Sequence, residues 1–575
     1  QQPLRVDPLL MEIQQQRTAA IAKAMPSAVC VYSAGGGGGG SGVLISKDGY
    51  ALTNFHVTSP SGAYMQCSLA DGEVYDAVII GIDPVGDLAL IRLLGRDDFP
   101  VAEMTDSDLA NAGDYCFAIG NPFLLASNLQ PTVTYGILSG VHRYQYPSGT
   151  LLEYADCLQT DASINPGNSG GPLYDSAGRL LGINGRASFE KRGRVNVGVG
   201  YAISINQAKR FVGYLHSGRI VDHATLGATV ATDPELGVRV SNILESSDAY
   251  RRGLRYNDEV LEIAGRPVQT ANDVQNMLGT IPRGWRVPIV FRHDGETVRT
   301  LVRLSGVHGR DELLAKMSSV MPSPTPAPKK PSKKKDDEKK DDEKKDGEGK
   351  EENKSRRRRR GGTGTAGSQM PSQVAAIYEA KRGYANYHVN RLAQRRVHRG
   401  LRKLADNALM KDDVWSLRGT VEGNNERVVK IRIGADSSQI VVGDQAIDLQ
   451  HEKTDSEDRY DSIISQSPAA LLTCLHHYRR FVRGELESAG DTSYLGTMPL
   501  LGGEDHDCTI VVADDLETRY LTEVDSGRLA AIECFAGTDV DPAELFFEYN
   551  DDGSLRLMDL RFGLESQVRV VLGTN

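Results

Sequence analysis

The chain carries the run Gly167-Asn168-Ser169-Gly170-Gly171-Pro172 directly after Asn165-Pro166. A serine flanked by glycines on a turn is exposed, and the missing side chains let a substrate backbone approach closely. The same turn can aim the amides of Gly167 and Ser169 at one point, as an oxyanion hole requires. A glycine-rich surface turn without chemistry has the same composition, so the serine needs partners elsewhere in the chain.

Two candidate partners lie upstream of this turn. The run Thr53-Asn54-Phe55-His56-Val57 ends a predicted strand with a histidine, and Asp87 stands at the mouth of the apolar run Leu88–Leu93. His, Asp and Ser in this order is the order found in chymotrypsin-type barrels. The sequence therefore predicts a catalytic triad of His56, Asp87 and Ser169.

Short β-branched runs separated by glycine and aspartate turns fill the region from Ala28 to about Asn206. Many short strands at this spacing predict a β-barrel or sandwich. Before them, apolar residues recur at a helical period from Leu9 to Met25 and end at Pro26. We expect an N-terminal helix within residues 1–27 and a β-rich domain over residues 28–222.

Five motifs in a fixed order resemble the HtrA/Deg family of bacterial envelope serine proteases: Gly40-Ser41-Gly42-Val43, Thr53–Val57, Asp87-Leu88-Ala89-Leu90, Ile119-Gly120-Asn121-Pro122 and Gly167–Pro172. The resemblance spans residues 9 to about 305. It implies a chymotrypsin-like double β-barrel with His56, Asp87 and Ser169 as the triad, amides of Gly167 and Ser169 as the oxyanion hole, and no metal or cofactor. Phe55 departs from the small residue common at that position, but it adjoins the histidine without replacing it.

The resemblance also implies a specificity pocket, walled by Ser163, Ile164, Asn184 and Tyr201. No acidic residue stands at the expected base of this pocket. A pocket without a carboxylate does not attract Arg or Lys, so small aliphatic side chains are the expected preference.

Residues 223–306 resemble a PDZ domain of the α+β class. We expect Gly237 and Val238 to offer amides to the carboxylate of a peptide C-terminus, and the strand edge through Val240 to add the peptide as an extra strand. An ordinary turn between two strands is the alternative explanation of this segment.

The formal net charge of −10 conceals a basic block and a strongly acidic block. Residues 329–411 hold 25 Lys and Arg against 12 Asp and Glu, whereas residues 412–575 hold 14 against 32. Alternating prolines and charge repeats predict a disordered linker over residues 307–371. A basic helical segment is expected over residues 372–411, in which several of Arg391, Arg395, Arg396, Arg399 and Arg402 recur at three- or four-residue steps and so lie along one face. It is either a hydrated spacer, a contact for an anionic surface, or a contact for the acidic modules of the chain itself; nucleic acid is disfavoured.

Hairpin signals return over residues 412–575, and Pro468–Ser488 reads as a helix. The expected fold is an antiparallel sheet with helix cover, loosely similar to LolA-like half-barrels that hold hydrophobic ligands. Adjacent His476 and His477 are expected to form a surface pair. The seven cysteines lie at wide, irregular spacings, which favours scattered buried thiols, although one or two disulfides stay open.

The fold class is thus multidomain and mainly β, and the function that these signals favour is a serine endopeptidase of unfolded envelope proteins, periplasmic or secreted. The resemblance implies protein substrates, C-terminal peptides at the PDZ domain, and a homo-oligomer that is a trimer or larger. A non-proteolytic chaperone or scaffold, and a carrier of a hydrophobic ligand, are the alternatives. Because the sequence starts at Gln1 without an initiator Met, we expect any secretion signal to have been removed already.

Overall fold

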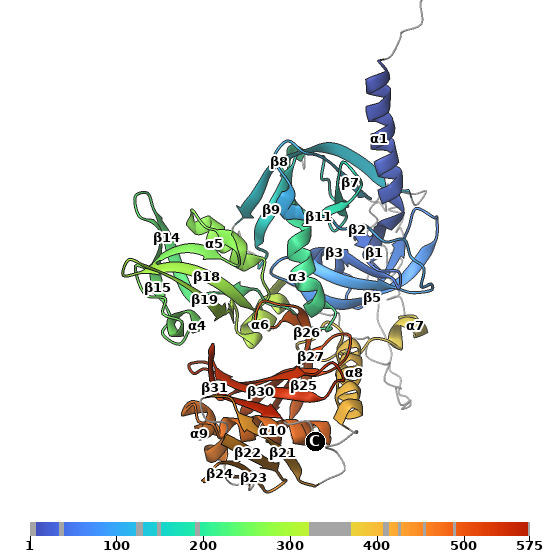
Figure 1. The fold of residues 1–575 in the computed structure, drawn as a ribbon. Coiled ribbons are helices and arrows are strands. Elements are labelled where there is room, and N and C mark those ends of the chain that lie inside the picture. The colour runs from blue at the N-terminus through green and yellow to red at the C-terminus, as the bar shows by residue number, and fades with distance from the viewer. Residues whose placement is uncertain are drawn as a thin grey trace, which may run out of the picture.

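The structure is a computed structural model of the 575-residue chain, and it describes residues 7–33, 39–121, 130–145, 151–189, 196–320, 370–405, 413–423, 427–451, 456–486 and 490–572. A helix, two barrels, a smaller α+β unit and a large sheet follow one another along the chain (Figure 1). Within these ranges, the structure has no helix that combines the length and apolar character needed to cross a membrane.

Helix α1 (Pro8–Ala24) stands away from the barrels in Figure 1. Asp7 caps it by accepting a hydrogen bond from the Leu9 amide at 2.9 Å, and Pro8 occupies the first turn, where no amide donor is needed. Only Ala20 and Ala24 of α1 are buried, at the end where the 3-10 turn η1 (Met25–Ser27) leads into the first barrel. The helix expected from the apolar spacing is present.

Two closed six-stranded antiparallel barrels follow. The first has the order β1-β2-β3-β6-β5-β4, and its strands are β1 (Ala28–Ser33), β2 (Gly39–Leu44), β3 (Tyr50–Thr53), β4 (Tyr64–Ser68), β5 (Val74–Asp83) and β6 (Leu88–Leu93). The second has the order β10-β11-β12-β9-β8-β7, and its strands are β7 (Tyr115–Gly120), β8 (Thr132–Gln145), β9 (Tyr154–Thr160), β10 (Pro172–Asp175), β11 (Leu180–Phe189) and β12 (Asn196–Ser204). The short turns α2 (Phe55–Thr58) and η2 (Ser107–Leu109) lie in their connections. The expected double β-barrel is confirmed.

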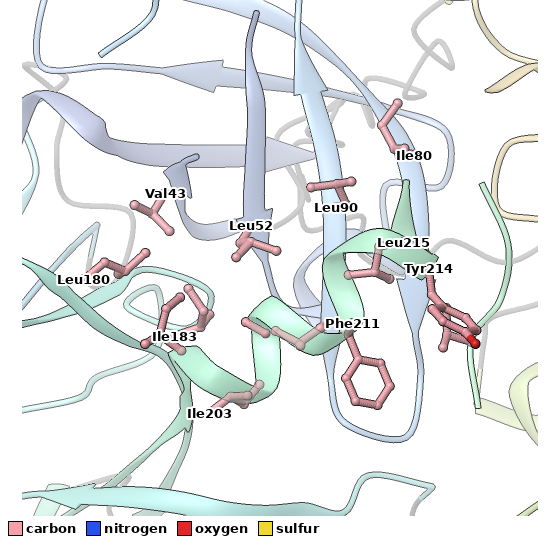
Figure 2. Close-up of a cluster of buried hydrophobic side chains, with 14 of the residues drawn as sticks. Val43, Leu52, Ile80, Leu90, Leu180, Ile183, Ile203, Phe211, Tyr214 and Leu215 are labelled. Carbon is pink, nitrogen blue, oxygen red and sulfur yellow. The ribbon is translucent and has the colours of Figure 1, made fainter. Parts of the chain in front are cut away.

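Helix α3 (Ile205–Leu215) packs into the core that the two barrels share. Leu215 is fully buried in a cluster with Leu90 of the first barrel and Ile183 of the second, as Figure 2 shows. Gly81 on β5 leaves room for the helix end, because a Cβ there would lie 2.1 Å from the Leu215 carbonyl oxygen. The helix therefore locks the two barrels against each other, and the junction between them holds the candidate site.

The smaller unit is built on a sheet of order β14-β15-β16-β18-β19, with β17 paired to β16. Its elements are β13 (Ala224–Thr225), β14 (Ala228–Asp233), β15 (Gly237–Ile243), α4 (Asp248–Arg251), β16 (Glu259–Ile263), β17 (Arg266–Pro267), α5 (Ala271–Gly279), β18 (Arg286–His293), β19 (Glu296–Arg303), β20 (Ser305–Gly306) and α6 (Arg310–Val320). Val240, Met277 and Phe291 are buried in one core, so α5 covers one face of the sheet. The α+β architecture agrees with the expectation.

The C-terminal part is one antiparallel sheet of eleven strands in the order β24-β23-β22-β21-β31-β30-β29-β28-β27-β26-β25. These strands are β21 (Trp415–Val421), β22 (Arg427–Ile433), β23 (Ser437–Val442), β24 (Gln445–Gln450), β25 (Asp491–Pro499), β26 (Asp505–Ala513), β27 (Leu516–Glu523), β28 (Leu529–Phe535), β29 (Ala543–Tyr549), β30 (Leu555–Phe562) and β31 (Glu565–Leu572). Its helices are α7 (Ser372–Ala375), α8 (Tyr387–Ala405), α9 (Ser456–Ile464) and α10 (Ala470–Val482). The hairpins expected from the turn signals in this region are present, as β21–β22, β27–β28 and β29–β30.

Helix α8 joins this sheet to the two barrels. The side-chain amide of Asn390 donates to the carbonyl of Ser217, just after α3, at 2.6 Å and to the carbonyl of Tyr494 on β25 at 2.7 Å. The buried Val397 and Leu401 pack into the core of the sheet. One helix thus contacts both parts, and Arg396 on it also pairs with Asp507 on β26 of the sheet at 2.7 Å.

Two sequence expectations were wrong. Residues 310–320, expected in the linker, form α6, because Leu313 and Met317 are one turn apart and both are buried, Met317 in the core of the first barrel. His476 and His477, expected at the surface, are only 2% and 1% exposed, since α10 lies with most of its circumference against other elements. Residues 321–369, the rest of the expected linker, lie outside the described residues. The seven cysteines are buried and unpaired, as favoured.

Candidate active site

His56 lies in α2, the single helical turn that follows β3. Its ring Nδ1 is 2.7 Å from Oδ2 of Asp87, and its backbone amide donates to Oδ1 of the same carboxylate at 3.0 Å. The ring stays accessible, because the side chain is 40% exposed. Burial lowers the pKa of His56, but the charge and hydrogen bond of Asp87 outweigh burial, so the net pKa is raised above its ordinary value of 6.5.

Asp87 is fully buried at the start of β6, with a φ of +60°. Its carboxylate also accepts a hydrogen bond from the hydroxyl of Tyr154 on β9. Its backbone carbonyl accepts from the Phe55 amide at 3.2 Å and from the Asn54 side chain at 2.9 Å. Asp87 therefore ties the histidine turn to both barrels. The sequence did not single out Tyr154, and no motif marks it; only the fold brings β9 beside Asp87.

Ser169 lies on the tight turn between β9 and β10. Gly170 in this turn has a φ of +81°, a conformation that glycine adopts without strain, and its amide donates to the Asn184 carbonyl at 2.7 Å. The amide of Ser41 donates to the Ser169 carbonyl at 2.8 Å, which fastens the turn to the first barrel. The turn is thus held by β2 on one side and by β11 on the other.

The hydroxyl of Ser169 donates to the carbonyl of Gly185 at 3.1 Å. Among the hydrogen bonds of the described residues, none joins Ser169 to His56. The structure therefore brings His56 and Asp87 into contact, whereas the serine adopts a rotamer directed at β11. Rotation about χ1 moves the oxygen among staggered positions without any change of the backbone.

The carbonyl of Gly167 accepts a hydrogen bond from the Ser41 hydroxyl at 2.7 Å, and Gly167 has a φ of +106°. The amide of Asn168 donates back to the Asn165 carbonyl at 2.9 Å, so it faces into the turn. Within the described part of the chain, the amides of Gly167 and Ser169 donate no hydrogen bond that the structure records. Both amides can therefore donate a hydrogen bond to an oxyanion. Ser41 orients this turn, a role that the sequence did not assign to it.

The four residues expected in the specificity pocket play different parts. Ile164 is buried against Gly200, where a Cβ would lie 2.6 Å from the Ile164 side chain. Asn184 is fully buried, and its side chain donates to the Pro172 carbonyl at 2.9 Å, so it supports the serine turn from within. Ser163 is exposed and Tyr201 is half-buried.

The expected peptide-binding edge in the smaller unit was wrong. Strand β15, which holds Gly237, Val238 and Val240, pairs with β14 on one side and β16 on the other, so it has no open edge. Val238 and Val240 are 2% and 1% exposed and belong to the core. The sheet ends at β14, beside α5, after a turn at Gly227 with a φ of +71°. Local sequence cannot tell an edge strand from its neighbour, because both read as short β-branched runs.

The chain is similar to several known proteins over part of its length. Residues 40–183 match the family described as a trypsin-like peptidase domain. The "Probable periplasmic serine endoprotease DegP-like" of Chlamydia trachomatis serovar D is 34% identical over 286 residues, which cover 48% of this chain and 55% of that protein. The "Periplasmic serine endoprotease DegP" of Escherichia coli K12 is 34% identical over 277 residues, which cover 46% and 56%. A solved structure, "HtrA-type protease AlgW with tripeptide", is 33% identical with a TM-score of 0.42, covering 51% of this chain and 98% of that one.

The two closed barrels and the matched domain define residues 28–204 as a chymotrypsin-like serine peptidase fold. Within that class, the chain is similar to periplasmic serine endoproteases named DegP and DegP-like, as the resemblance to the HtrA/Deg family led us to expect. The chain spans just over half the length of the curated relatives that it matches.

Proposed function

We propose that this protein is a serine endopeptidase of the bacterial cell envelope. The observation that carries the proposal is the pair formed by His56 and the buried Asp87, with Nδ1 and Oδ2 2.7 Å apart, beside the glycine turn that presents Ser169. The named relatives are periplasmic endoproteases, so we place this chain in the periplasm or outside the cell.

In the proposed mechanism, the hydroxyl of Ser169 leaves the Gly185 carbonyl and turns towards Nε2 of His56. His56 takes the hydroxyl proton as Ser169 attacks a peptide carbonyl, and Asp87 stabilises the imidazolium that forms. The amides of Gly167 and Ser169 stabilise the oxyanion, and His56 then gives its proton to the leaving amine. No metal or cofactor takes part in these steps.

The substrates proposed are unfolded or misfolded envelope proteins, cut after small aliphatic side chains at the pocket near Ile164 and Tyr201. Cleavage of β-casein, an unstructured protein, by the wild type and by Ser169→Ala tests the activity. We expect the wild type to cut and the variant to lose roughly 10⁶-fold in rate. Equal rates would instead favour the chaperone or scaffold alternative.

We further propose that residues 223–306 act as a PDZ domain whose ligand adds to β14 rather than to β15. A peptide C-terminus would lie between β14 and α5, with its carboxylate at the turn around Gly227. A peptide with a free carboxylate should bind, and its amidated form should not. Loss of binding in a variant with proline at Val230, in the middle of β14, would support this edge, whereas unchanged binding would refute it.

Helix α1 supports the proposed assembly of copies into a trimer or larger oligomer. Leu9, Leu10, Met11 and Ile13 are between 42% and 60% exposed, which is unusual for four neighbouring apolar side chains. We propose that a second copy covers them. The double variant Leu10→Asp/Ile13→Asp should sediment as a smaller species than the wild type; a monomeric wild type would contradict this assembly.

For the C-terminal part of the chain we propose two contacts, one between α8 and a membrane and one between the sheet and the smaller unit. We do not propose that it carries a ligand. A groove of about 490 Å³ on α8 is lined by five basic side chains, Arg395, His398, Arg399, Arg402 and Lys403, and we propose that it contacts an anionic membrane surface. The sheet itself rests on the smaller unit through buried ion pairs. Between α10 and the sheet, Phe481 stacks on Tyr520 with ring centroids 4.3 Å apart, which speaks against a ligand in that space.

A further inference from the structure

His223 lies at the junction where the barrels end and the smaller unit begins, directly before β13. Its Nε2 is 2.8 Å from Oδ2 of Asp83, and the two side chains are 2% and 0% exposed. Nδ1 of the ring has no hydrogen-bond partner within the described part of the chain. The ring therefore carries a proton on Nε2, and this N–H donates a hydrogen bond to Asp83. Burying such a pair costs hydration free energy unless hydrogen bonds to its surroundings compensate for the loss.

The other oxygen of Asp83 caps the loop that leads to Asp87. Oδ1 of Asp83 accepts hydrogen bonds from the amides of Val85 at 3.1 Å and Gly86 at 2.9 Å. Gly86 immediately precedes Asp87, whose φ of +60° departs from the usual range of a non-glycine residue. The position of the Asp87 carboxylate therefore depends on the carboxylate of Asp83.

The ring of His223 also packs directly against this loop. A Cβ on Gly86 would lie 2.8 Å from both Nε2 and Cε1 of the ring, a distance too short for a side chain. On α3, Phe211 stands against the ring, with centroids 4.6 Å apart. His223 is thus held between α3 and the Asp83–Asp87 loop.

The backbone around His223 is fastened to both neighbouring units. On the barrel side, Val221 donates to the Ile82 carbonyl at 2.9 Å. On the side of the smaller unit, Val307 donates to the His223 carbonyl at 3.0 Å, and Ala224 donates to the Ile281 carbonyl at 3.0 Å. A displacement of the smaller unit therefore acts directly on the residue that braces the Asp87 loop.

We propose that His223 is a positioning residue of the active site: through Asp83 it holds the Asp87 loop in place, and it makes the geometry of the His56–Asp87 pair depend on how the smaller unit is seated. The inference rests on the proposed protease function. It concerns a contact outside the triad, and it gives a physical route by which ligand binding to the smaller unit changes the rate of catalysis.

The test compares three variants with β-casein as substrate. His223→Ala should lower kcat roughly 10–100-fold, the cost of a small misplacement of a catalytic group, with KM within about twofold. His223→Gln, whose amide still donates to Asp83, should restore most of kcat. His223→Phe, which fills the space without a donor, should not. If instead Phe restores kcat and Gln does not, the ring only fills space and the proposal is wrong.

His308→Ala is the matched control. His308 pairs with Asp222, the residue that precedes His223, with Nδ1 and Oδ1 2.9 Å apart. The pair lies at the same junction, but the structure records no contact between His308 and the Asp83–Asp87 loop. It should keep kcat within about twofold, and an equal loss would show general loosening of the junction and overturn the proposal. If the wild type cuts casein in a Ser169-dependent way while His223→Ala keeps its kcat, only this inference fails. If Ser169→Ala cuts as fast as the wild type, the proposed function fails, and this inference with it.

Discussion

Arg303 on β19 and Glu533 on β28 form a buried two-bond ion pair across 230 residues of sequence. Nη1 of Arg303 donates to Oε2 of Glu533 at 3.1 Å, and Nη2 donates to Oε1 and also to Glu544 at 2.9 Å. Arg286 on β18 donates to both oxygens of Glu544. The smaller unit and the C-terminal sheet therefore meet through a cluster of compensating charges, to which Arg519 on β27 also contributes, 4.0 Å from Glu533.

Replacement of Arg303 by methionine should release the C-terminal sheet from the smaller unit. The variant leaves Glu533 with Arg519 at 4.0 Å and Glu544 with Arg286, so the two buried carboxylates lose part of their compensation, and breaking a buried ion pair costs up to about 3–5 kcal/mol. Hydrogen exchange of β28 and β29 should accelerate accordingly. Arg299→Met is the control on the same strand, since Arg299 is 67% exposed and its pair with Glu262 is worth little. Equal exchange in the two variants would contradict a stabilising role of the Arg303 pair.

The pH profile of proteolysis should have its acid limb above pH 6.5. The reaction needs neutral His56, whose pKa is raised because the charge of Asp87 outweighs burial, so activity is lost as the pH falls through that raised value. In Tyr154→Phe, the Asp87 carboxylate loses one hydrogen bond and attracts the protonated ring of His56 more strongly. The acid limb, measured as kcat/KM against pH, should then move further up. A shift to lower pH would refute this role of Tyr154.

Acid should weaken the C-terminal sheet through its buried histidines. Burial lowers the pKa of His451 to about 4 and that of His477 to about 3, with nearby arginines adding to the effect. Because the unfolded chain binds these protons below about pH 6.5 and the folded chain does not, stability falls as the pH drops through this range. At pH 5 the loss is roughly 2 kcal/mol for each histidine. Urea unfolding at pH 7 and pH 5 should show it, and His451→Gln should reduce the difference.

The basic groove on α8 should bind vesicles that contain anionic lipid. We expect Arg395→Gln/Arg399→Gln/Arg402→Gln to weaken co-sedimentation with phosphatidylglycerol vesicles by roughly tenfold or more, at about 1 kcal/mol for each charge, and salt to weaken the wild type. A control with the same loss of charge replaces the exposed Arg418, Lys430 and Arg432 on β21 and β22. If the control variant loses as much binding as the groove variant, net charge rather than the groove governs binding.

Several elements could be predicted correctly from the sequence, because their signals are local. Apolar spacing placed α1, β-branched runs placed the barrel strands, and turn residues placed the hairpins of the C-terminal sheet. The predictions failed where the outcome depends on a distant partner. Leu313 and Met317 make α6 a helix only because other parts of the chain cover them. Likewise, β15 is not an edge strand because β14, an equally ordinary run, lies outside it.

The sequence alone predicted the class of chemistry, because a glycine-flanked serine, an upstream histidine and an upstream aspartate each sit in a short local motif and follow one another in the family's order. Only the tertiary structure decided what supports that chemistry. Tyr154 reaches Asp87 because the start of β9 lies against the loop before β6, where the Glu153 amide donates to the Val85 carbonyl, and His223 reaches Asp83 because the chain returns to pair with Ile82 at the end of β5. Burial and hydrogen bonds between residues far apart in sequence leave no periodic or compositional trace, so they become visible only when the chain is folded.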